Sequence, residues 1–243
     1  MSTGINLGFK GDTKALWHAV DTDGSGECSI YEFDPSTAIS LAKLTVWAKR
    51  KFGGMPQAFK CIDDKRHHRV TREEFYTRCK EEGMKGHLWP AVRALDPGTG
   101  TIKVEDLGFL QNWIVPSWMV ADPDHAAVQK MRTLLAEQYG GSIRGWRRAM
   151  DVDQSNGLCW DEFSLFCRKH ELANAAGMWR ALDEDHSGSI TLCEVDERAA
   201  DILCAFKLWL ISSFGGVMEG FMAMDEHKKG EVSYVTYVFF FSK

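Results

Sequence analysis

Oxygen-bearing side chains recur at alternate positions in three twelve-residue segments of this chain. The donors of the segment 183–194 are Asp183, Asp185, Ser187, the backbone carbonyl of Ser189, and Glu194. A hard divalent cation takes about 6–8 oxygen ligands, and carboxylates and hydroxyls at this spacing supply them. Gly188 at the sixth position permits the sharp turn that the segment needs to surround an ion. The pattern predicts a Ca²⁺ site.

Two other segments carry nearly the same pattern. The donors of residues 21–32 are Asp21, Asp23, Ser25, the carbonyl of Glu27, and Glu32. The donors of residues 151–162 are Asp151, Asp153, Ser155, the carbonyl of Gly157, and Glu162. Asn156 replaces the glycine of the third segment, and asparagine tolerates left-handed backbone better than most residues. We therefore expect two to three Ca²⁺ sites.

Three further segments keep the outline but not the donors: residues 63–74, 95–106 and 225–236. Lys65 and His67 stand where the first of these needs oxygen donors, and a basic side chain repels a cation. Zinc binding by the neighbouring His67 and His68 is an alternative, although adjacent histidines rarely point at one ion. We predict that these three incomplete loops no longer bind metal tightly.

An internal repeat relates the segments. A shift of 162 residues superposes Trp17 on Trp179, Asp21 on Asp183, and Gly53-Gly54 on Gly215-Gly216 without a gap. Six such segments in series resemble the EF-hand superfamily and are similar to calmodulin, over residues of about 10 to 240. The resemblance implies an all-α fold of three helix–loop–helix pairs, with very short β-bridges between paired loops.

Two pairings of the loops are possible. Pairing inside each repeat unit would place Cys28 opposite Val70, Ile102 opposite Leu158, and Ile190 opposite Val232, and we favour it because no segment is left over. The alternative joins the loops that start at residues 151 and 183, which predicts cooperative binding. Extra residues around Pro116 and Pro123 indicate a hinge between an N-terminal region (1–115) and a C-terminal region (116–243).

Composition narrows the function. The net charge of −5 and the absence of a polybasic segment argue against nucleic-acid binding. No apolar run approaches the roughly 20 residues of a membrane helix. The start of the chain lacks a signal-peptide pattern, and the seven cysteines have no Cys-x-x-Cys spacing, which favours a reduced, intracellular and cytoplasmic setting. No catalytic motif is present, so we do not expect an enzyme.

The resemblance implies a calcium sensor or adaptor, in which helices reorient on Ca²⁺ binding and engage a protein partner. Two alternatives remain open. The chain could be a structural subunit of a larger assembly with constitutive or vestigial sites, or a passive calcium buffer. The sequence leaves the oligomeric state undetermined.

Overall fold

The computed structural model describes residues 10–21 and 24–241, and these residues are mostly helical, as the all-α prediction requires. Asp23, one of the predicted ligands, lies outside the described residues. The α-helices are α1 (Thr13–Val20), α2 (Ile30–Phe33), α3 (Pro35–Phe52), α4 (Met55–Ile62), α5 (Arg72–Glu81), α6 (Trp89–Leu95), α7 (Gly108–Asn112), α8 (His125–Tyr139), α9 (Ser142–Gly145), α10 (Trp160–Lys169), α11 (Ala175–Leu182), α12 (Leu192–Val195), α13 (Glu197–Phe214), α14 (Val217–Met224) and α15 (Tyr234–Phe241). The shorter elements are β1 (Arg69–Thr71), β2 (Thr101–Lys103), the 3-10 turns η1 (Glu105–Leu107) and η2 (Ser117–Met119), and the π-turn η3 (Trp146–Met150).

The two longest helices, α3 and α13, are copies of one another in the 162-residue repeat. Each has 18 residues and is capped by an aspartate, Asp34 in α3 and Asp196 in α13, whose carboxylate accepts a hydrogen bond from the third backbone N–H of the helix. Each ends at a glycine in left-handed conformation, Gly53 (φ 83°) or Gly215 (φ 87°). The glycine pairs therefore end these helices.

Each loop that forms a bridge pairs with a loop of the neighbouring two-loop repeat and not with the other loop of its own repeat. The pairing that we favoured from the sequence is therefore wrong. We call each loop with its flanking helices a unit and name it by the first aspartate of the loop: units 21, 63, 96, 151, 183 and 225. β1 runs antiparallel to β2, so Val70 of unit 63 lies opposite Ile102 of unit 96. Leu158 of unit 151 forms an antiparallel bridge with Ile190 of unit 183, through N–H···O bonds of 2.8 and 3.0 Å.

The physical reason is the length of the intervening helices. Units 21 and 63 are separated by α3 and units 183 and 225 by α13, and 18 helical residues span about 27 Å. Units 63 and 96 are joined by a shorter connection, as are units 151 and 183. The incomplete loops 63–74 and 95–106 thus meet each other, and so do the two predicted calcium loops 151–162 and 183–194.

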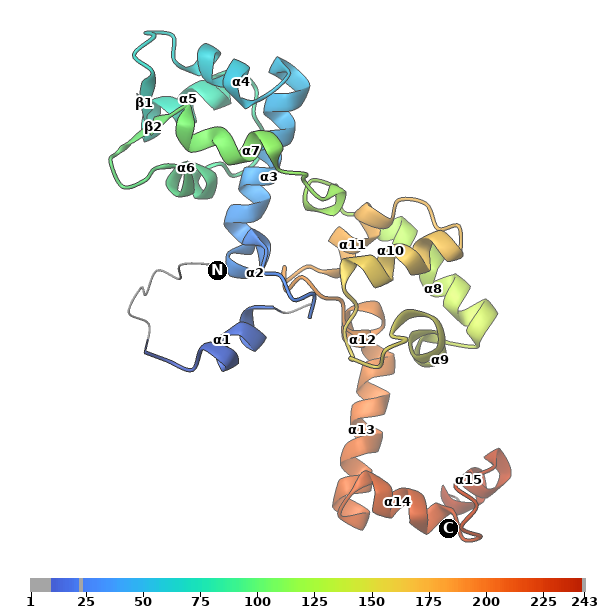
Figure 1. Cartoon of the computed structure of the whole chain (residues 1–243). Helices are drawn as coiled ribbons and strands as arrows, with labels where there is room; N and C mark the ends of the chain where they lie inside the picture. Colours follow the sequence, from blue (N-terminus) through green and yellow to red (C-terminus); the bar gives the residue numbers. More distant parts are fainter. Residues whose placement is uncertain (1–9, 22–23, 242–243) are drawn as a thin grey trace.

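Two hydrophobic clusters form the core. One lies between residues 41 and 110, and the other combines residues 118–195 with Tyr31, Ala38 and Ala42. Helix α3 contributes to both, because Leu41 and Leu44 point into the first cluster while Ala38 and Ala42 point into the second. Figure 1 shows α3 running from the α4–α7 group towards the group that contains α8–α12.

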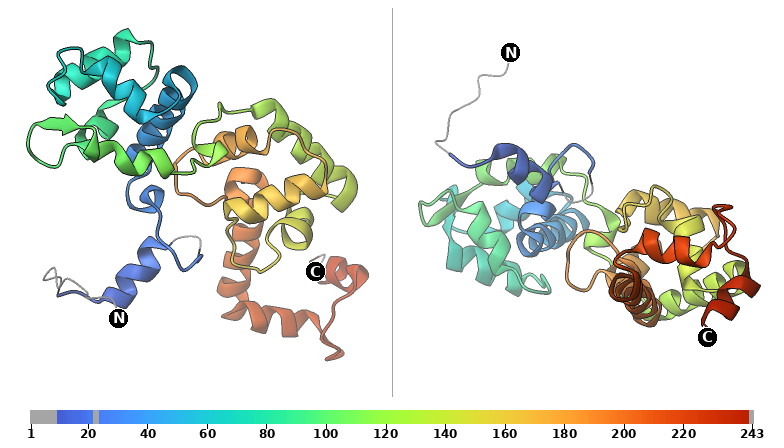
Figure 2. Two further views of the ribbon diagram at one scale, coloured as in Figure 1. Left: turned by 45° about the horizontal axis from the view of Figure 1, so that its top comes forward. Right: turned by 90° about the horizontal axis from the view of Figure 1, so that it is seen from below.

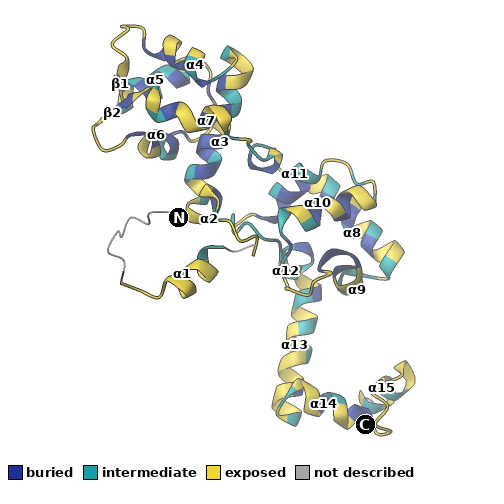
Figure 3. Cartoon of the chain, in the orientation of Figure 1, coloured by how far each residue is buried: buried dark blue, intermediate teal, exposed yellow. Residues whose placement is uncertain are grey.

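Helices α13, α14 and α15 form a C-terminal arm. The arm extends away from both groups, as two different views show (Figures 1 and 2), and most of its surface is exposed (Figure 3). Among the described residues, no single helix is long and apolar enough to cross a membrane. Taken together, α13 and α14 are long and apolar enough to do so, but a bend of 80° separates them.

Candidate metal-binding loops

The loop 183–194 gathers three carboxylates. One oxygen each from Asp183, Asp185 and Glu194 lies within 4.8 Å of the others, and no other group of three such side chains is this close among the described residues. None of the three forms an ion pair within the described part of the chain. Like charges at this separation repel one another, so the cluster is suited to a cation.

Asp183 is the most buried of the three and is held by a residue from another unit. It follows α11 directly, and its carboxylate accepts a 2.9 Å hydrogen bond from the hydroxyl of Tyr31 on α2. Two longer bonds of 3.4 Å come from Ser187 Oγ and the backbone N–H of Gly188. Burial, and then the charge of Asp183, raise the pKa of Tyr31 far above its usual value, so the hydroxyl keeps its proton and donates.

Glu194 caps the next helix. Its carboxylate accepts hydrogen bonds from the backbone N–H (2.7 Å) and the hydroxyl (2.9 Å) of Thr191, which forms a capping box at the start of α12. Burial raises the pKa of Glu194, although the bonds from Thr191 oppose that shift. The carbonyl of Ser189, the predicted backbone donor, accepts a 2.8 Å bond from Ser187 Oγ. The structure therefore brings together the three carboxylates of Asp183, Asp185 and Glu194, and Ser187 links Asp183 to the carbonyl of Ser189.

The loop 151–162 has the same frame but a looser cluster. Asp151 is buried, and Asn156 adopts φ 68°, as its place in the glycine position requires. Ser155 donates its backbone N–H to Asp153 (3.0 Å) and its hydroxyl to the carbonyl of Gly157 (2.7 Å). The bond from Ser155 lowers the pKa of Asp153. Glu162 accepts from the backbone N–H of Cys159 (3.0 Å), so it caps α10 as Glu194 caps α12.

A π-turn explains the one extra residue before Asp151. In the repeat, Trp17 and Trp179 lie four residues before the first aspartate, whereas Trp146 lies five residues before Asp151. The backbone N–H of Asp151 donates to the carbonyl of Trp146 (2.9 Å), which closes a wider turn in η3. The indole N–H of Trp146 then donates to Asp151 Oδ2 (3.0 Å). Trp146 therefore orients a predicted ligand.

The loop 21–32 is described only in part. Asp21 Oδ2 accepts from the backbone N–H of Gly26 (3.1 Å), while Asp21 Oδ1 is buried and has no hydrogen-bond partner among the described residues. A buried carboxylate oxygen without a partner costs free energy unless a cation or donor reaches it. Ser25 donates to the carbonyl of Glu27 (2.9 Å), and Glu32 accepts from the backbone N–H of Ser29 (2.6 Å). The described donors again fit a hard cation.

Basic side chains stabilise two of the incomplete loops. Lys65 Nζ, at the third loop position, lies 2.7 Å from the carboxylate of Glu74 at the twelfth position. The bond from Lys65 lowers the pKa of Glu74 to about 2. Arg72 forms an ion pair with Asp96, whose side chain is fully buried. An ammonium or guanidinium thus neutralises these acids from within the protein.

The third incomplete loop uses backbone donors instead. The carboxylate of Asp225 accepts hydrogen bonds from the backbone N–H groups of Lys229 (3.0 Å) and Gly230 (2.7 Å). Asp63 is held in the same way by the N–H groups of His67 (3.0 Å) and His68 (2.7 Å), so these histidines contribute backbone rather than ring atoms to that aspartate. Backbone hydrogen bonds therefore hold Asp63 and Asp225 in the same way in their two loops.

No protein-family model matches the sequence, and no curated protein is significantly similar to it.

Proposed function

We propose that this chain is a calcium-binding protein of the EF-hand type and acts as a calcium sensor or adaptor. The observation that carries the proposal is the convergence of Asp183, Asp185 and Glu194 within 4.8 Å, with no ion pair to any basic residue that the structure describes. Loop 151–162 is the bridged partner of this loop. Loop 21–32 is a third candidate, because Asp21 Oδ1 has no hydrogen-bond partner within residues 10–21 and 24–241.

The ligands would be the oxygens already assigned to each loop. Bound Ca²⁺ would supply positive charge that offsets the repulsion among the carboxylates. Ser187 donates its hydroxyl to the carbonyl of Ser189 and its backbone N–H to Asp185. The carboxylates of Asp183 and Asp185 lie close to that of Glu194 on α12. Glu194 is a helix cap in this structure, so its use as a ligand competes with its two bonds to Thr191.

Two connections make a sensor more plausible than a passive buffer. Glu194 lies on α12, and α12 leads through Asp196 directly into α13 and the C-terminal arm. Asp183 is bonded to Tyr31, which precedes α3, the helix shared by both hydrophobic clusters. Movement of Glu194 on binding Ca²⁺ would therefore shift α13, and movement of Asp183 would shift Tyr31 and α3. A sensor requires such a coupling between its metal site and a larger element.

Calorimetric titration with Ca²⁺ tests the proposal. We expect two to three sites in the wild-type protein, with positive cooperativity between loops 151–162 and 183–194 because they are bridged. Glu194→Gln should remove one site and weaken its partner, and Glu162→Gln should do the reverse. Glu74→Gln in an incomplete loop is the matched control and should change nothing. Absence of heat in the wild type at millimolar Ca²⁺, or an equal effect of all three variants, would contradict the assignment.

A structural role fits the α4–α7 group better. Its paired loops 63–74 and 95–106 are neutralised by Lys65 and Arg72, and β1 and β2 join them. Such a pair needs no metal for its packing. We therefore expect hydrogen exchange of β1 and β2 to be equally slow in chelator and in Ca²⁺, whereas the exchange of Leu158 and Ile190 should slow in Ca²⁺. Equal slowing in both bridges would argue against this division of roles.

A further inference from the structure

The junction between α12 and α13 is held by side chains from α8 and α9, the helices that lead into the neighbouring predicted calcium loop. Arg132 of α8 donates its Nε–H to the carbonyl of Val195 (2.7 Å) and a terminal N–H to the carbonyl of Glu194 (3.4 Å). Ser142, the first residue of α9, donates its hydroxyl to the carboxylate of Asp196 (2.6 Å). The exit of one predicted loop is therefore bonded to the entrance of the other.

The chemistry of Arg132 suits the end of a helix. Helix α12 ends at Val195, and the last carbonyls of a helix have no partner within it. A guanidinium carries several N–H donors in a fixed planar fork, so a single arginine can reach two neighbouring carbonyls. Arg132 is partly buried and forms no ion pair with the acidic residues that the structure describes. It therefore serves the backbone of the junction and not a carboxylate.

The first copy of the repeat satisfies the corresponding aspartate in a different way. Asp34 is the counterpart of Asp196, and its Oδ2 accepts a 2.6 Å bond from Thr37 Oγ1 of the same helix. The counterpart of Thr37 is Ala199, which has no hydroxyl, and Ser142 donates to Asp196 Oδ2 in its place. The second copy therefore has a bond between two units where the first copy has a bond within one helix.

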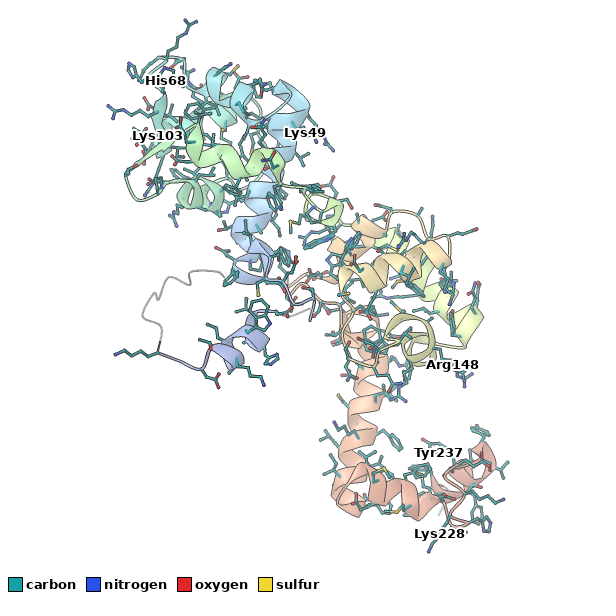
Figure 4. All side chains as sticks on the ribbon, viewed as in Figure 1. Lys49, His68, Lys103, Arg148, Lys228 and Tyr237 are labelled. Atoms are coloured by element: carbon teal, nitrogen blue, oxygen red, sulfur yellow. The ribbon has the colours of Figure 1, made fainter. Side chains whose placement is uncertain are left out.

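The burial of the junction differs between the copies as well. Val195 is 0% exposed, whereas Phe33, its counterpart at the end of α2, is 70% exposed. Helix α9 contacts α13, and Figure 4 shows the side chains of α9 and of the start of α13 meeting close to η3, on which Arg148 is labelled. Unit 151 therefore both covers the α12–α13 junction and bonds to it.

The bonds from Arg132 hold the backbone of a proposed ligand. They reach the carbonyl of Glu194 and that of the next residue. With the backbone in this position, a carboxylate oxygen of Glu194 lies within 4.8 Å of an oxygen of Asp183 and of Asp185. Ligands that are already gathered bind an ion more tightly, because less free energy is needed to order them. The bonds from α8 and α9 therefore favour the arrangement that a cation needs.

We propose that Arg132 and Ser142 are positioning residues for Glu194, and that through them unit 151 sets the Ca²⁺ affinity of loop 183–194. The inference rests on the proposed binding of Ca²⁺ by that loop. Neither side chain is among the oxygen donors, since both act through the backbone and the helix cap of the α12–α13 junction. This link is separate from the β-bridge between the two loops.

The charge of Arg132 gives the opposite expectation from its positioning role. By Coulomb repulsion alone, the guanidinium disfavours a cation in loop 183–194, so its removal would tighten Ca²⁺ binding. Loss of positioning weakens binding instead. The sign of the change therefore separates the two effects, and Ser142→Ala, which changes no charge, provides an independent measure.

Calorimetric titration with Ca²⁺ tests the proposal in the Glu162→Gln protein, in which we expect the neighbouring loop to bind no ion. Arg132→Met and Ser142→Ala should each weaken binding by loop 183–194 about tenfold, which is typical when a residue that orients a metal ligand is removed. Arg168→Met is the matched control, because Arg168 is exposed on α10, and it should leave the affinity unchanged. Circular dichroism should show that all three variants keep their helices.

A second substitution separates positioning from simple stabilisation of α13. Ala199→Ser in the Ser142→Ala protein returns a hydroxyl to the helix position that Thr37 occupies in the first copy. We expect it to restore the free energy of unfolding in chelator, measured with urea. It should not restore the Ca²⁺ affinity, because the bond between the two units is still missing.

Three results would overturn the positioning role and leave calcium binding by loop 183–194 intact. The first is an unchanged Ca²⁺ affinity in both Arg132→Met and Ser142→Ala. The second is tighter binding by Arg132→Met, which would show that only its charge matters. The third is full recovery of the affinity on Ala199→Ser. Absence of Ca²⁺ binding by the wild-type protein would overturn both this inference and the proposed function.

Discussion

The hydrogen bond from Tyr31 to Asp183 predicts a measurable coupling between the proposed calcium loop 183–194 and α3. Tyr31→Phe removes only the hydroxyl, which lies 2.9 Å from Asp183 Oδ2, and leaves a ring that is buried against Trp118. A net contribution of about 1.5–3 kcal/mol is typical of a hydrogen bond to a charged group. The two remaining side-chain and loop bonds to Asp183 are 3.4 Å long and compensate little. Without Ca²⁺ we therefore expect a loss of about 2 kcal/mol in the free energy of unfolding.

The same substitution should cost less with Ca²⁺ present. A cation near Asp183 reduces the charge that the Tyr31 hydroxyl stabilises, so the bond falls towards the value of about 1 kcal/mol that is typical of neutral pairs. By linkage, the difference of about 1 kcal/mol appears as roughly fivefold tighter Ca²⁺ binding by Tyr31→Phe. The hydroxyl thus favours the metal-free state of the loop.

Urea unfolding in chelator and in millimolar Ca²⁺, with calorimetry of Ca²⁺ binding, measures both quantities. Tyr139→Phe is the matched control, because the Tyr139 hydroxyl contacts the His170 ring (3.0 Å) and no predicted ligand. It should lower stability equally in both buffers. An equal loss for Tyr31→Phe in both buffers, or weaker Ca²⁺ binding by that variant, would refute the coupling through Asp183.

Two further predictions concern parts of the chain that bind no metal in this scheme. Arg72→Met leaves the buried carboxylate of Asp96 without its ion pair. Because the side chain of Arg72 is itself 39% exposed, we expect a loss of about 1–2 kcal/mol in the free energy of unfolding. Urea unfolding should give the same loss in chelator and in Ca²⁺. Burial, and then the charge of Lys169, lower the pKa of His170 in the folded state. The stability that this residue contributes is therefore complete above about pH 6.5, its usual pKa, and is lost as the pH falls through the lowered folded-state pKa. His170→Gln should therefore flatten the unfolding free energy between about pH 7 and pH 5, and an unchanged slope would show that another group titrates there.

Local chemistry made much of the fold predictable. The glycine pairs end α3 and α13, and the helices meet the twelve-residue loops where the acids predict. Asn156 takes the left-handed conformation that its position implies. Even the π-turn before Asp151 has a signal in the sequence, because one residue is inserted between Trp146 and the loop relative to the other copies. These features depend on neighbours close in sequence, and such neighbours are visible in the order of residues.

The pairing of loops depends on distance in space, and the repeat alone gave the wrong answer. The repeat identifies which units share an ancestor, but it does not measure how far a helix carries one loop from the next. Counting the 18 residues of α3 gives about 27 Å, which is enough to favour the pairing that was observed. The error therefore came from assuming that the two loops that repeat together along the sequence also pack against each other.

The contact between Tyr31 and Asp183 has a different kind of signal. The two residues are 152 positions apart, so no local pattern relates them. The repeat, however, places Tyr31 on Cys193, an exposed residue on α12, while Glu32 and Glu194 superpose without change. The two copies therefore keep the same predicted ligand but pack against different surroundings. In unit 21 the differing residue, Tyr31, donates a hydrogen bond to Asp183 of unit 183. Its counterpart in unit 183, Cys193, is exposed. Differences between the copies therefore mark the residues through which one loop can influence another.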